Sequence, residues 1–346
     1  MNGKGTNGLI LVTGATGIVG IPLVVSLLRE GFDVKAIRRP SSQIDRVEDA
    51  VRRVDASMLD RLSWVAGDMT DGASLEQALE GVSCVYHCAA LVSFHPADHA
   101  AMTKVNVDGT ANLVNAMLHC DTPRLVHVSS VAALGRKAGV PTDETTLFEE
   151  HPGTSAYARS KHRAEMEAWR GAAEGLPGGV VVVNPVVVIG EGDFSRSSGA
   201  LFEQVHRGLK WYPTGSNGFV HSHDVARACV RLGMSDTRDE RFVLCAGTKP
   251  YKDLMQAIAK HLGVPGPSRA VQPWMAGLAW RLSALVERLF GIRALATRES
   301  LANTGAHHAY DGTKISRHLP GWSYTPIDQA IAVTAEAFLR EKDASC

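Results

Sequence analysis

The sequence lacks an excess of charge of either sign. Lys+Arg and Asp+Glu both number 36, so the formal net charge of the 346-residue chain is +0. Binding to nucleic acid or to an anionic surface usually needs a cluster of basic side chains, and we therefore expect no nucleic-acid partner. The hydrophobic content of 45% and the charged content of 21% are typical of a globular chain that forms one large domain or two closely packed ones.

Spacings for metal ligands and disulfides are also missing. The six cysteines follow neither pattern, and no histidine stands at ligand spacing from a carboxylate partner, so we expect no metal site. Reduced cysteines predict an intracellular, cytoplasmic protein. Residues 1–8 are short, polar and rich in glycine, which predicts a disordered leader and not a signal peptide.

No hydrophobic run is long enough to cross a membrane. Residues 274–290 are apolar but are interrupted by Arg281, Glu287 and Arg288, whereas a spanning helix needs about 20 apolar residues. We therefore predict no integral membrane span. The composition of this segment favours the wall of a pocket over contact with a membrane surface, which stays open as the alternative.

A dinucleotide-binding turn is present near the N-terminus. Residues 9–12 form an apolar run typical of a buried parallel strand, and an amphipathic helix is predicted over residues 18–30. The turn between them can bring its backbone close to a pyrophosphate, which the N-terminus of the helix attracts. The residues predicted to bind the cofactor here are Gly14, Thr16, Gly17, Ile18 and Gly20.

The next strand, predicted over residues 33–37, ends in Arg38 and Arg39. An NAD site usually carries an acidic residue at this point to hold the ribose 2′-hydroxyl. Two guanidinium groups suit a 2′-phosphate instead, so we predict NADP(H) as the preferred cofactor, with NAD(H) possible. The alternative is a solvated basic strand end without a role in binding.

Small or polar residues end the following strands. Asp68, after a strand over residues 62–66, could accept a hydrogen bond from an adenine amino group or simply stabilise a turn. Ala89 and Ala90 end a strand over residues 84–90 and leave room for a cofactor. Asn106 lies inside a helical pattern, where it could hold a water or a backbone carbonyl.

A Tyr–Lys pair carries the chemistry. Tyr157 and Lys161 lie on one face of a helix that begins at Ser155, because residues four apart stack on a helix. An ammonium beside a phenol lowers the phenol pKa, which gives a proton donor near neutral pH. Ser130 follows a strand over residues 124–128, at the edge where open α/β sheets bind ligands. Alone, the Tyr–Lys spacing also fits an ordinary surface helix.

The alternation of strands and helices predicts an α/β fold with a Rossmann-type doubly wound parallel sheet. The most apolar run, residues 179–190, leaves the sheet at Asn184-Pro185. A seventh strand is predicted over residues 241–246. We expect a dinucleotide-binding domain of residues 1–190 plus 221–248. A smaller, mostly helical C-terminal substrate-binding domain would consist of residues 191–220 plus 249–346.

Together these motifs resemble the extended (atypical) short-chain dehydrogenase/reductase family, the NAD-dependent epimerase/dehydratase group. Residues 13–20 match its Thr-Gly-x-x-Gly-x-x-Gly pattern, and residues 105–110, 128–130 and 221–228 look like its recurring segments. The resemblance implies that Tyr157 is the catalytic acid/base. It implies that Lys161 lowers the pKa of Tyr157 and binds the nicotinamide ribose, and that Ser130 holds the substrate oxygen.

The same resemblance implies further contacts to the cofactor. Asp68 and Met69 would flank the adenine, and Pro185 and Val187 would meet the carboxamide edge of the nicotinamide. Asn106 would be a further member of the site. Enzymes of this family usually pair through a four-helix bundle, which implies a homodimer.

The branch within the family is indicated by Val183-Asn184-Pro185-Val186-Val187. Sugar-nucleotide epimerases and dehydratases usually carry an Arg-aromatic-aromatic-Asn segment there, and this chain looks more like the dihydroflavonol 4-reductase and 3β-hydroxysteroid dehydrogenase branch. That implies reduction of a ketone or aldehyde, or oxidation of the matching alcohol. Apolar segments around Phe94 and over residues 192–218 and 274–295 suggest a hydrophobic substrate. A nucleotide-sugar epimerase/dehydratase and a non-catalytic NADP-sensing protein stay open as alternatives.

Overall fold

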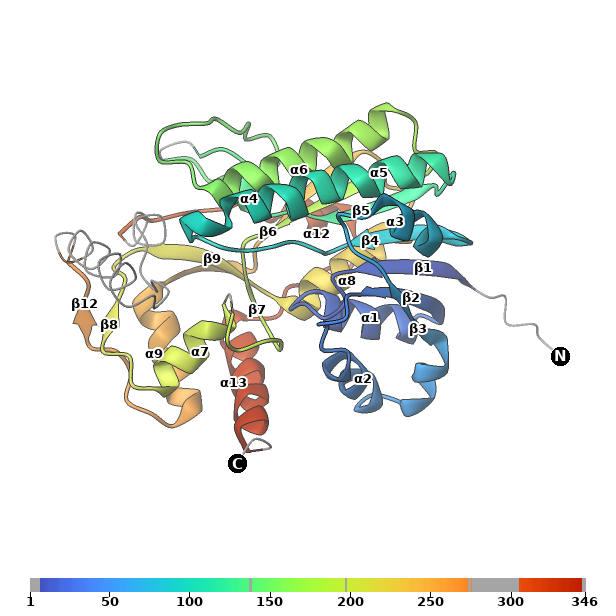
Figure 1. Ribbon diagram of the computed structural model, residues 1–346. Helices are drawn as coiled ribbons and strands as arrows, with labels where there is room; N and C mark the ends of the chain where they lie inside the picture. Colours follow the sequence, from blue (N-terminus) through green and yellow to red (C-terminus); the bar gives the residue numbers. More distant parts are fainter. Residues whose placement is uncertain (1–6, 137–138, 197, 273–274, 276–304, 344–346) are drawn as a thin grey trace.

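The computed structural model in Figure 1 describes residues 7–136, 139–196, 198–272, 275 and 305–343. Its main element is a sheet of parallel strands. The strands are β1 (Asn7–Thr13), β2 (Phe32–Arg38), β3 (Leu62–Ala66), β4 (Val82–His87), β5 (Arg124–Val128), β6 (Val180–Pro185) and β10 (Glu240–Leu244). Their order, β10-β6-β5-β4-β1-β2-β3, confirms the doubly wound sheet.

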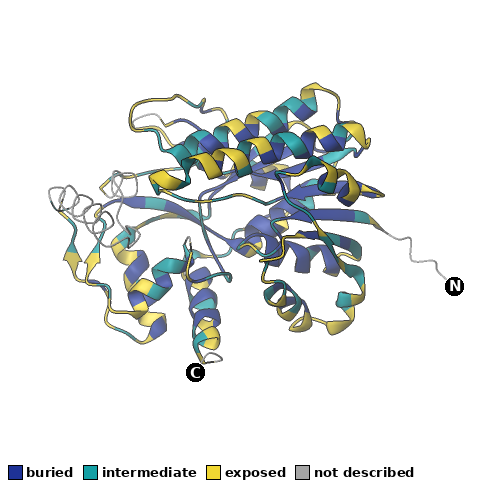
Figure 2. Ribbon diagram, in the orientation of Figure 1, coloured by how far each residue is buried: buried dark blue, intermediate teal, exposed yellow. Residues whose placement is uncertain are grey.

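Helices cover both faces of this sheet (Figure 1). One face carries α1 (Gly20–Arg29), α2 (Asp45–Arg52) and α8 (Ser222–Gly233). The other carries α3 (Gly72–Leu79), α4 (His99–Met102), α5 (Gly109–His119) and α6 (Ala156–Ala173). Because successive strand residues point to opposite faces, Val126 packs in the first of these cores and Leu125 in the second. The burial colours of Figure 2 show both cores lying against the strands.

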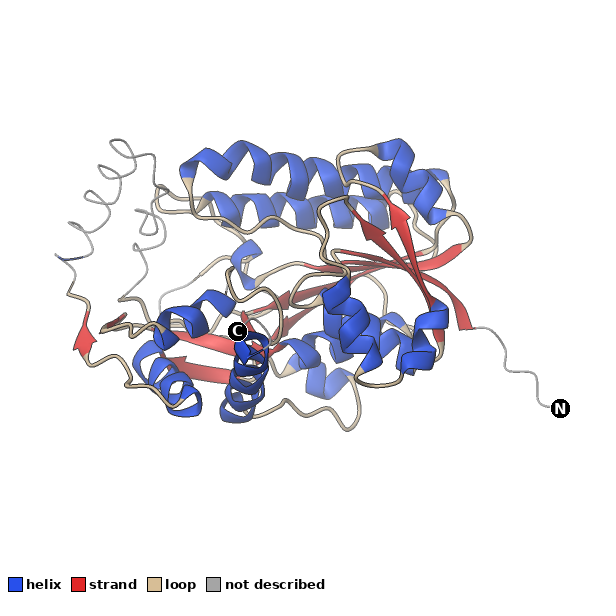
Figure 3. Ribbon diagram, turned by 60° about the horizontal axis from the view of Figure 1, so that its bottom comes forward, coloured by secondary structure: helices blue, strands red, loops and turns tan. Residues whose placement is uncertain are grey.

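A third core belongs to the smaller C-terminal region, which Figure 3 shows beside the main sheet. It contains α7 (Gly199–His206), α9 (Tyr251–Leu262) and α13 (Ile327–Asp343), while α12 (Lys314–His318) packs near β10. The region also contains strands: β7 (Val187–Ile189), β9 (Ser216–His221) and β11 (Gly247–Pro250) form one sheet, and β8 (Trp211–Tyr212) and β12 (Arg269–Ala270) form another. The prediction of a mostly helical region missed these strands.

The chain leaves the main sheet where the proline predicted it. β6 ends at Pro185, and two residues later the chain enters β7, which is an edge strand of the three-stranded sheet. Proline cannot donate a ladder hydrogen bond, so the two halves of this apolar run belong to different sheets. Val186 is the residue at which the chain crosses from β6 in the main sheet to β7 in the C-terminal region.

One predicted strand and two helical patterns differ in detail from the structure. The strand expected over residues 84–90 ends at His87, so Ala89 and Ala90 lie beyond it. Residues 42–61, a charged stretch with the pattern of a surface helix, contain α2 followed by a 3-10 turn, Ala56–Arg61, which Asp55 caps. The helical pattern that contains Asn106 is divided into α4, a π-helical turn, Thr103–Asp108, and α5.

Among the described residues, no helix is both long enough and apolar enough to span a bilayer. Residues 276–290 of the predicted pocket wall, and residues 1–6 of the predicted leader, lie outside the described part of the chain. The five described cysteines are all free thiols.

Candidate active site

The Gly-rich turn after β1 is packed too tightly for side chains at Gly14 and Gly20, so its exposed polar groups are those of the backbone. Gly14 has a φ of +67°, and a Cβ on it would lie 2.6 Å from the Ala89 nitrogen. A Cβ on Gly20 would lie 2.1 Å from the Gly14 oxygen. Gly17 is exposed, and within the described residues the backbone N–H of Ile18 has no hydrogen-bond acceptor. The turn therefore has the open amides that an anion needs.

The end of β4 is bonded to this turn. The Ala89 amide donates to Thr13 Oγ1 at 3.2 Å, and the Cys88 amide donates to the Thr13 carbonyl at 3.1 Å. Ala89 is half-buried against Gly14, and Ala90 is exposed. The two alanines predicted to leave room for a cofactor thus lie directly beside the predicted pyrophosphate turn.

Ser130, Tyr157 and Lys161 come together at the end of β5. Ser155 caps α6 by accepting from the Ala158 amide at 3.0 Å, which places Tyr157 in the first turn. The Ser130 side chain lies close enough to Tyr157 to lower the pKa of its phenol. Lys161 is buried and its Nζ donates to the Val128 carbonyl at 3.0 Å. The sequence prediction placed these three residues in one site, and the structure brings them together.

The electrostatics of Tyr157 differ from the expectation. Burial raises its pKa, and the Ser130 side chain opposes that rise only in part. Burial also lowers the pKa of Lys161 to about 8, because an ammonium is poorly solvated there. The net shift of the Tyr157 pKa is therefore upward and not downward as expected, because desolvation dominates at the buried phenol.

Asn106 lies in the π-helical turn and is 1% exposed. Its side chain accepts from the Leu91 amide at 2.7 Å and donates to the Leu91 carbonyl at 2.9 Å, which confirms the expectation that it holds a backbone carbonyl. It also donates to Ser160 Oγ at 3.0 Å. Such wide turns are rare and are frequent at functional sites. Asn106 ties the loop after β4 to the residue that precedes Lys161.

A buried carboxylate that we did not predict lies behind these residues. Glu165 is 1% exposed, accepts three hydrogen bonds and forms one ion pair. Its hydrogen-bond donors are Ser129 Oγ at 2.6 Å, Asn184 Nδ2 at 2.7 Å and Trp169 Nε1 at 3.2 Å, and its ion-pair partner is an Arg241 guanidinium nitrogen at 2.9 Å. The spacing could have revealed it, because Tyr157, Lys161 and Glu165 recur every four residues and so share one helix face.

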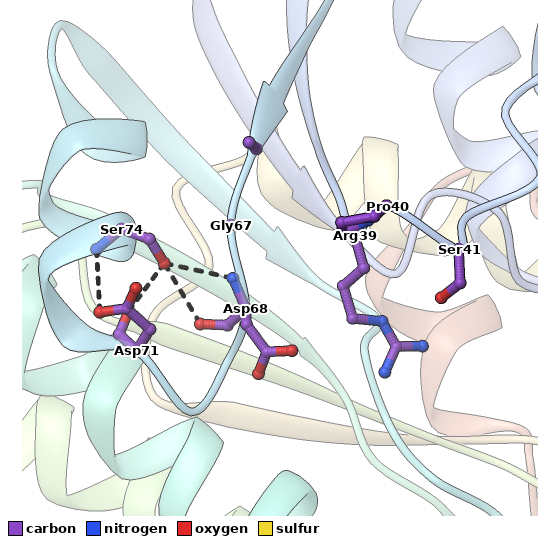
Figure 4. Close-up of a pocket in the computed structure, with 8 residues that line it drawn as sticks. Arg39, Pro40, Ser41, Gly67, Asp68, Asp71 and Ser74 are labelled. Atoms are coloured by element: carbon purple, nitrogen blue, oxygen red, sulfur yellow. Dashed lines mark hydrogen bonds between the residues drawn. The ribbon is translucent and has the colours of Figure 1, made fainter.

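A cavity of about 460 Å³ lies where the adenosine half of the cofactor was expected (Figure 4). It is lined by Arg39, Pro40, Ser41, Ala66, Gly67, Asp68, Asp71 and Ser74. Arg38 ends β2, is exposed and does not line this cavity. Met69 is 7% exposed and packs against Gly109. Arg39 and Asp68 therefore meet in one cavity, as the sequence predicted, while Arg38 and Met69 lie at its margins.

Asp68 has a structural role in this cavity. Its Oδ1 accepts from the amide and the hydroxyl of Thr70, both at 2.8 Å. These bonds lower the pKa of Asp68, with smaller contributions from Arg39 and Lys104. The turn-stabilising alternative is thus realised, and one carboxylate oxygen, Oδ2, has no hydrogen bond among the described residues.

Apolar side chains lie close to Tyr157. Phe94, after β4, is 41% exposed and its ring stands edge-on to the Tyr157 ring at 5.8 Å between centroids. Val92, two residues earlier, is 45% exposed. On the other side of the crossing, Pro185 is buried at the end of β6 and Val187 is half-buried at the start of β7. Phe94 therefore gives the phenol an apolar neighbour, and Val92, Pro185 and Val187 are apolar residues at the ends of the neighbouring elements.

Comparison with known proteins gives a consistent result. Residues 10–245 match the model of the NAD dependent epimerase/dehydratase family. A Synechocystis sp. protein that carries the name dihydroflavonol 4-reductase is 29% identical over 329 residues, which is 93% of this chain and 92% of that protein. Sterol demethylase protein B of Methylococcus capsulatus is 32% identical over 286 residues, 81% of this chain and 83% of that protein.

A solved structure agrees in fold over nearly the whole length. The crystal structure of PA4631, a nucleoside-diphosphate-sugar epimerase from Pseudomonas aeruginosa, aligns with a TM-score of 0.76 at 26% identity. The alignment covers 97% of this chain and 99% of that chain. The described fold and the family match thus point to the same group of proteins.

Proposed function

This chain belongs to the NAD-dependent epimerase/dehydratase family, and from that premise we propose an NADP(H)-dependent oxidoreductase that reduces a hydrophobic ketone or aldehyde, or oxidises the matching alcohol. The observation that carries the proposal is the meeting of Ser130, Tyr157 and Lys161 at the end of β5. Relatives with reductase names, such as the Synechocystis dihydroflavonol 4-reductase, support a carbonyl as the reacting group.

The residues present fit a dinucleotide. The open amides of the Gly-rich turn suit its pyrophosphate. Arg39 in the adenosine cavity supports a 2′-phosphate, with Arg38 close by in sequence. A bound NADPH would supply the hydride. We assign the remaining cofactor contacts to Thr16, Asp68, Met69, Ala89, Ala90, Asn106, Pro185 and Val187.

The protein's own part in the reaction is orientation and proton transfer. The Ser130 and Tyr157 side chains lie beside each other, so both hydroxyls can donate to one substrate oxygen. Tyr157 holds its proton firmly because burial raises its pKa, and it gives up that proton as negative charge develops on the substrate oxygen. The Lys161 ammonium stabilises the phenolate that remains. Apolar neighbours such as Phe94 exclude water and favour a substrate with apolar rings.

We also infer a cytoplasmic homodimer, with dinucleotide and substrate domains divided at residues 190, 220 and 248. The free cysteines support a reducing compartment. Met166 on α6 is 41% exposed, which supports pairing through α5 and α6. Sedimentation at micromolar concentration measures the dimer, and a monomer there would refute it.

A substrate panel followed by NADPH absorbance tests the function. It should contain aromatic aldehydes, flavanonols, steroid ketones and UDP-sugars, with Tyr157→Phe as the inactive control. We expect NADPH consumption with at least one ring-containing carbonyl. Conversion of a UDP-sugar without net NADPH consumption would instead support the epimerase alternative, which the fold of the Pseudomonas structure favours. NADPH binding without any turnover would support the sensing alternative.

A further inference from the structure

The buried carboxylate of Glu165 lies on α6, the helix that carries the catalytic residues. We propose that Glu165 is a positioning residue that fixes Ser130 relative to Tyr157 and keeps the buried Lys161 side chain charged. This inference rests on the proposed oxidoreductase function. Glu165 acts in two ways, a geometric one and an electrostatic one, and different variants separate them.

The geometric part concerns three successive residues at the end of β5. Lys161 donates to the Val128 carbonyl at 3.0 Å, and Ser129 Oγ donates to Glu165 at 2.6 Å. The Ser130 carbonyl accepts from Asn184 Nδ2 at 3.1 Å, and the same amide group donates to Glu165 at 2.7 Å. Each residue that leads up to and includes Ser130 is thus held from α6, directly or through Asn184.

Because Tyr157 begins that same helix, these bonds link the two hydroxyls that would share the substrate oxygen. A displacement of Ser130 by 1 Å is enough to cost a large part of the rate in a pre-organised site. Glu165 is well suited to prevent it, since its side chain is 1% exposed and bonded to β5 and β6 at once. Glu165 itself touches neither substrate nor cofactor in this assignment.

The electrostatic part concerns Lys161. Burial lowers its pKa, and Glu165 is the largest influence in the opposite direction. An isolated buried carboxylate would be costly, but the ion pair with Arg241 and three further donors stabilise its ionised form. Glu165 thus lies one helical turn from Lys161 on the same face of α6, and its carboxylate opposes the lowering of the Lys161 pKa.

Other titratable groups around Lys161 stay fixed in charge near neutral pH. His87, from β4, has its pKa lowered to about 3, and that of His127, from β5, is also well below its usual range, so both are neutral. Burial raises the pKa of the Cys88 thiol to about 12. Arg241, from β10, stays cationic. Among these groups and Lys161, Lys161 is thus the one expected to change charge between pH 7 and pH 9.

The test compares Glu165→Gln with Glu167→Gln, a matched change on the same helix at a half-exposed acid paired with Arg170. Two profiles are measured for each protein: kcat against pH, and the titration of Lys161 by NMR of ¹³C-labelled lysine. For Glu165→Gln we expect kcat to fall about 10- to 100-fold and both the alkaline limb and the Lys161 titration to move down by roughly one pH unit. Glu167→Gln should match the wild type.

Two further variants separate position from charge. Asn184→Ala removes the link to Ser130 and leaves the carboxylate, so kcat should fall while the Lys161 titration stays in place. Glu165→Asp keeps the charge but shortens its reach, so it should behave in the same way. A merely structural role of Glu165 would lower the melting temperature of Glu165→Gln without moving the Lys161 titration.

The inference is overturned if Glu165→Gln leaves the Lys161 titration where it is in the wild type. If that variant does not fold, wild-type kcat in both Asn184→Ala and Glu165→Asp overturns it. Failure of the proposed function is a distinct result: wild-type protein would turn over no carbonyl in the panel. The Lys161 titration can still be measured in that case, so it tests the electrostatic part independently.

Discussion

The two ends of the candidate site are built in different ways. At the catalytic end, Lys161 and Glu165 are almost fully buried and each is held by hydrogen bonds from the protein. At the adenosine end, Arg38 and Arg39 are exposed, and neither forms an ion pair within the described residues. The protein thus fixes the geometry of the catalytic end in advance. At the adenosine end it supplies positive charge that could pair with a phosphate of the ligand. Changes at the first end should cost rate, and changes at the second should alter the choice of cofactor.

The largest effect is expected at the catalytic end, from Tyr157→Phe. This change removes only the hydroxyl, so the fold and the binding of NADPH should persist, while turnover should fall by about 10²–10⁴, the usual contribution of a positioned acid. Steady-state rates and fluorescence titration with NADPH measure the two quantities. If a folded, NADPH-binding Tyr157→Phe protein reduced substrate at nearly the wild-type rate, the proton would have to come from another group. The catalytic end would then not depend on Tyr157.

The adenosine end is tested by changing Arg38 to Asp and Arg39 to Asn together. A charge-assisted hydrogen bond contributes about 1.5–3 kcal/mol, so Kd for NADPH should rise roughly 10- to 100-fold. Kd for NADH should change little, and kcat at saturating cofactor should stay near that of the wild type. Equal affinities of the wild-type protein for NADH and NADPH would show that the arginines do not select the phosphate.

The pH dependence of reduction distinguishes Lys161 from Tyr157. The pKa of Lys161 is lowered to about 8, so its ammonium is lost as pH rises through that value, whereas the raised pKa of Tyr157 keeps the phenol protonated there. We expect kcat to fall about tenfold between pH 7 and pH 9. If kcat fell only at pH 10 or above, the fall would instead be due to loss of the proton from the Tyr157 phenol.

The smallest effect is expected from Asp68→Asn. The amide oxygen of Asn can still accept from the Thr70 amide and hydroxyl, as Asp68 Oδ1 does. Kd for either cofactor should change by no more than about threefold, and the melting temperature should hold. Asp68→Ala is the matched comparison, since it removes the turn and should lower the melting temperature. A larger loss of affinity for both cofactors in Asp68→Asn would mean that the proposed contact of Asp68 to the adenine depends on its second carboxylate oxygen.

The main sheet could be predicted because its strands are short apolar runs in strict alternation with helices. Residues 124–128 and 62–66 were predicted with the bounds that β5 and β3 have in the structure. The predicted proximity of Ser130 and Tyr157 follows from the same regularity. Ser130 follows the carboxyl end of a parallel strand, and Tyr157 lies at the start of the next long helix, and both of these ends lie at the same edge of the sheet.

The remaining parts depend on contacts between distant residues. β9 contains Ser216, Asn217 and Gly218, which are poor strand formers, and it exists because Gly247–Pro250 pairs with it from a later segment. The raised pKa of Tyr157 depends on burial, which a motif does not report. Glu165 resembled any surface acid of a helix until its partners Asn184 and Arg241 were placed around it.

The π-helical turn between α4 and α5 has a consequence for insertions and deletions. A π turn closes on the fifth residue along where an α turn closes on the fourth, so the segment Thr103–Asp108 accommodates extra backbone within one long helical run. Each α-helical residue advances the chain by about 100°. Deleting a single residue here would remove that extra backbone, so α-helical bonding could continue with α4 and α5 close to their present phase and with Met102 still in the core. The same deletion within α5, which has no extra residue to lose, would rotate the helix by about that angle and should do more harm.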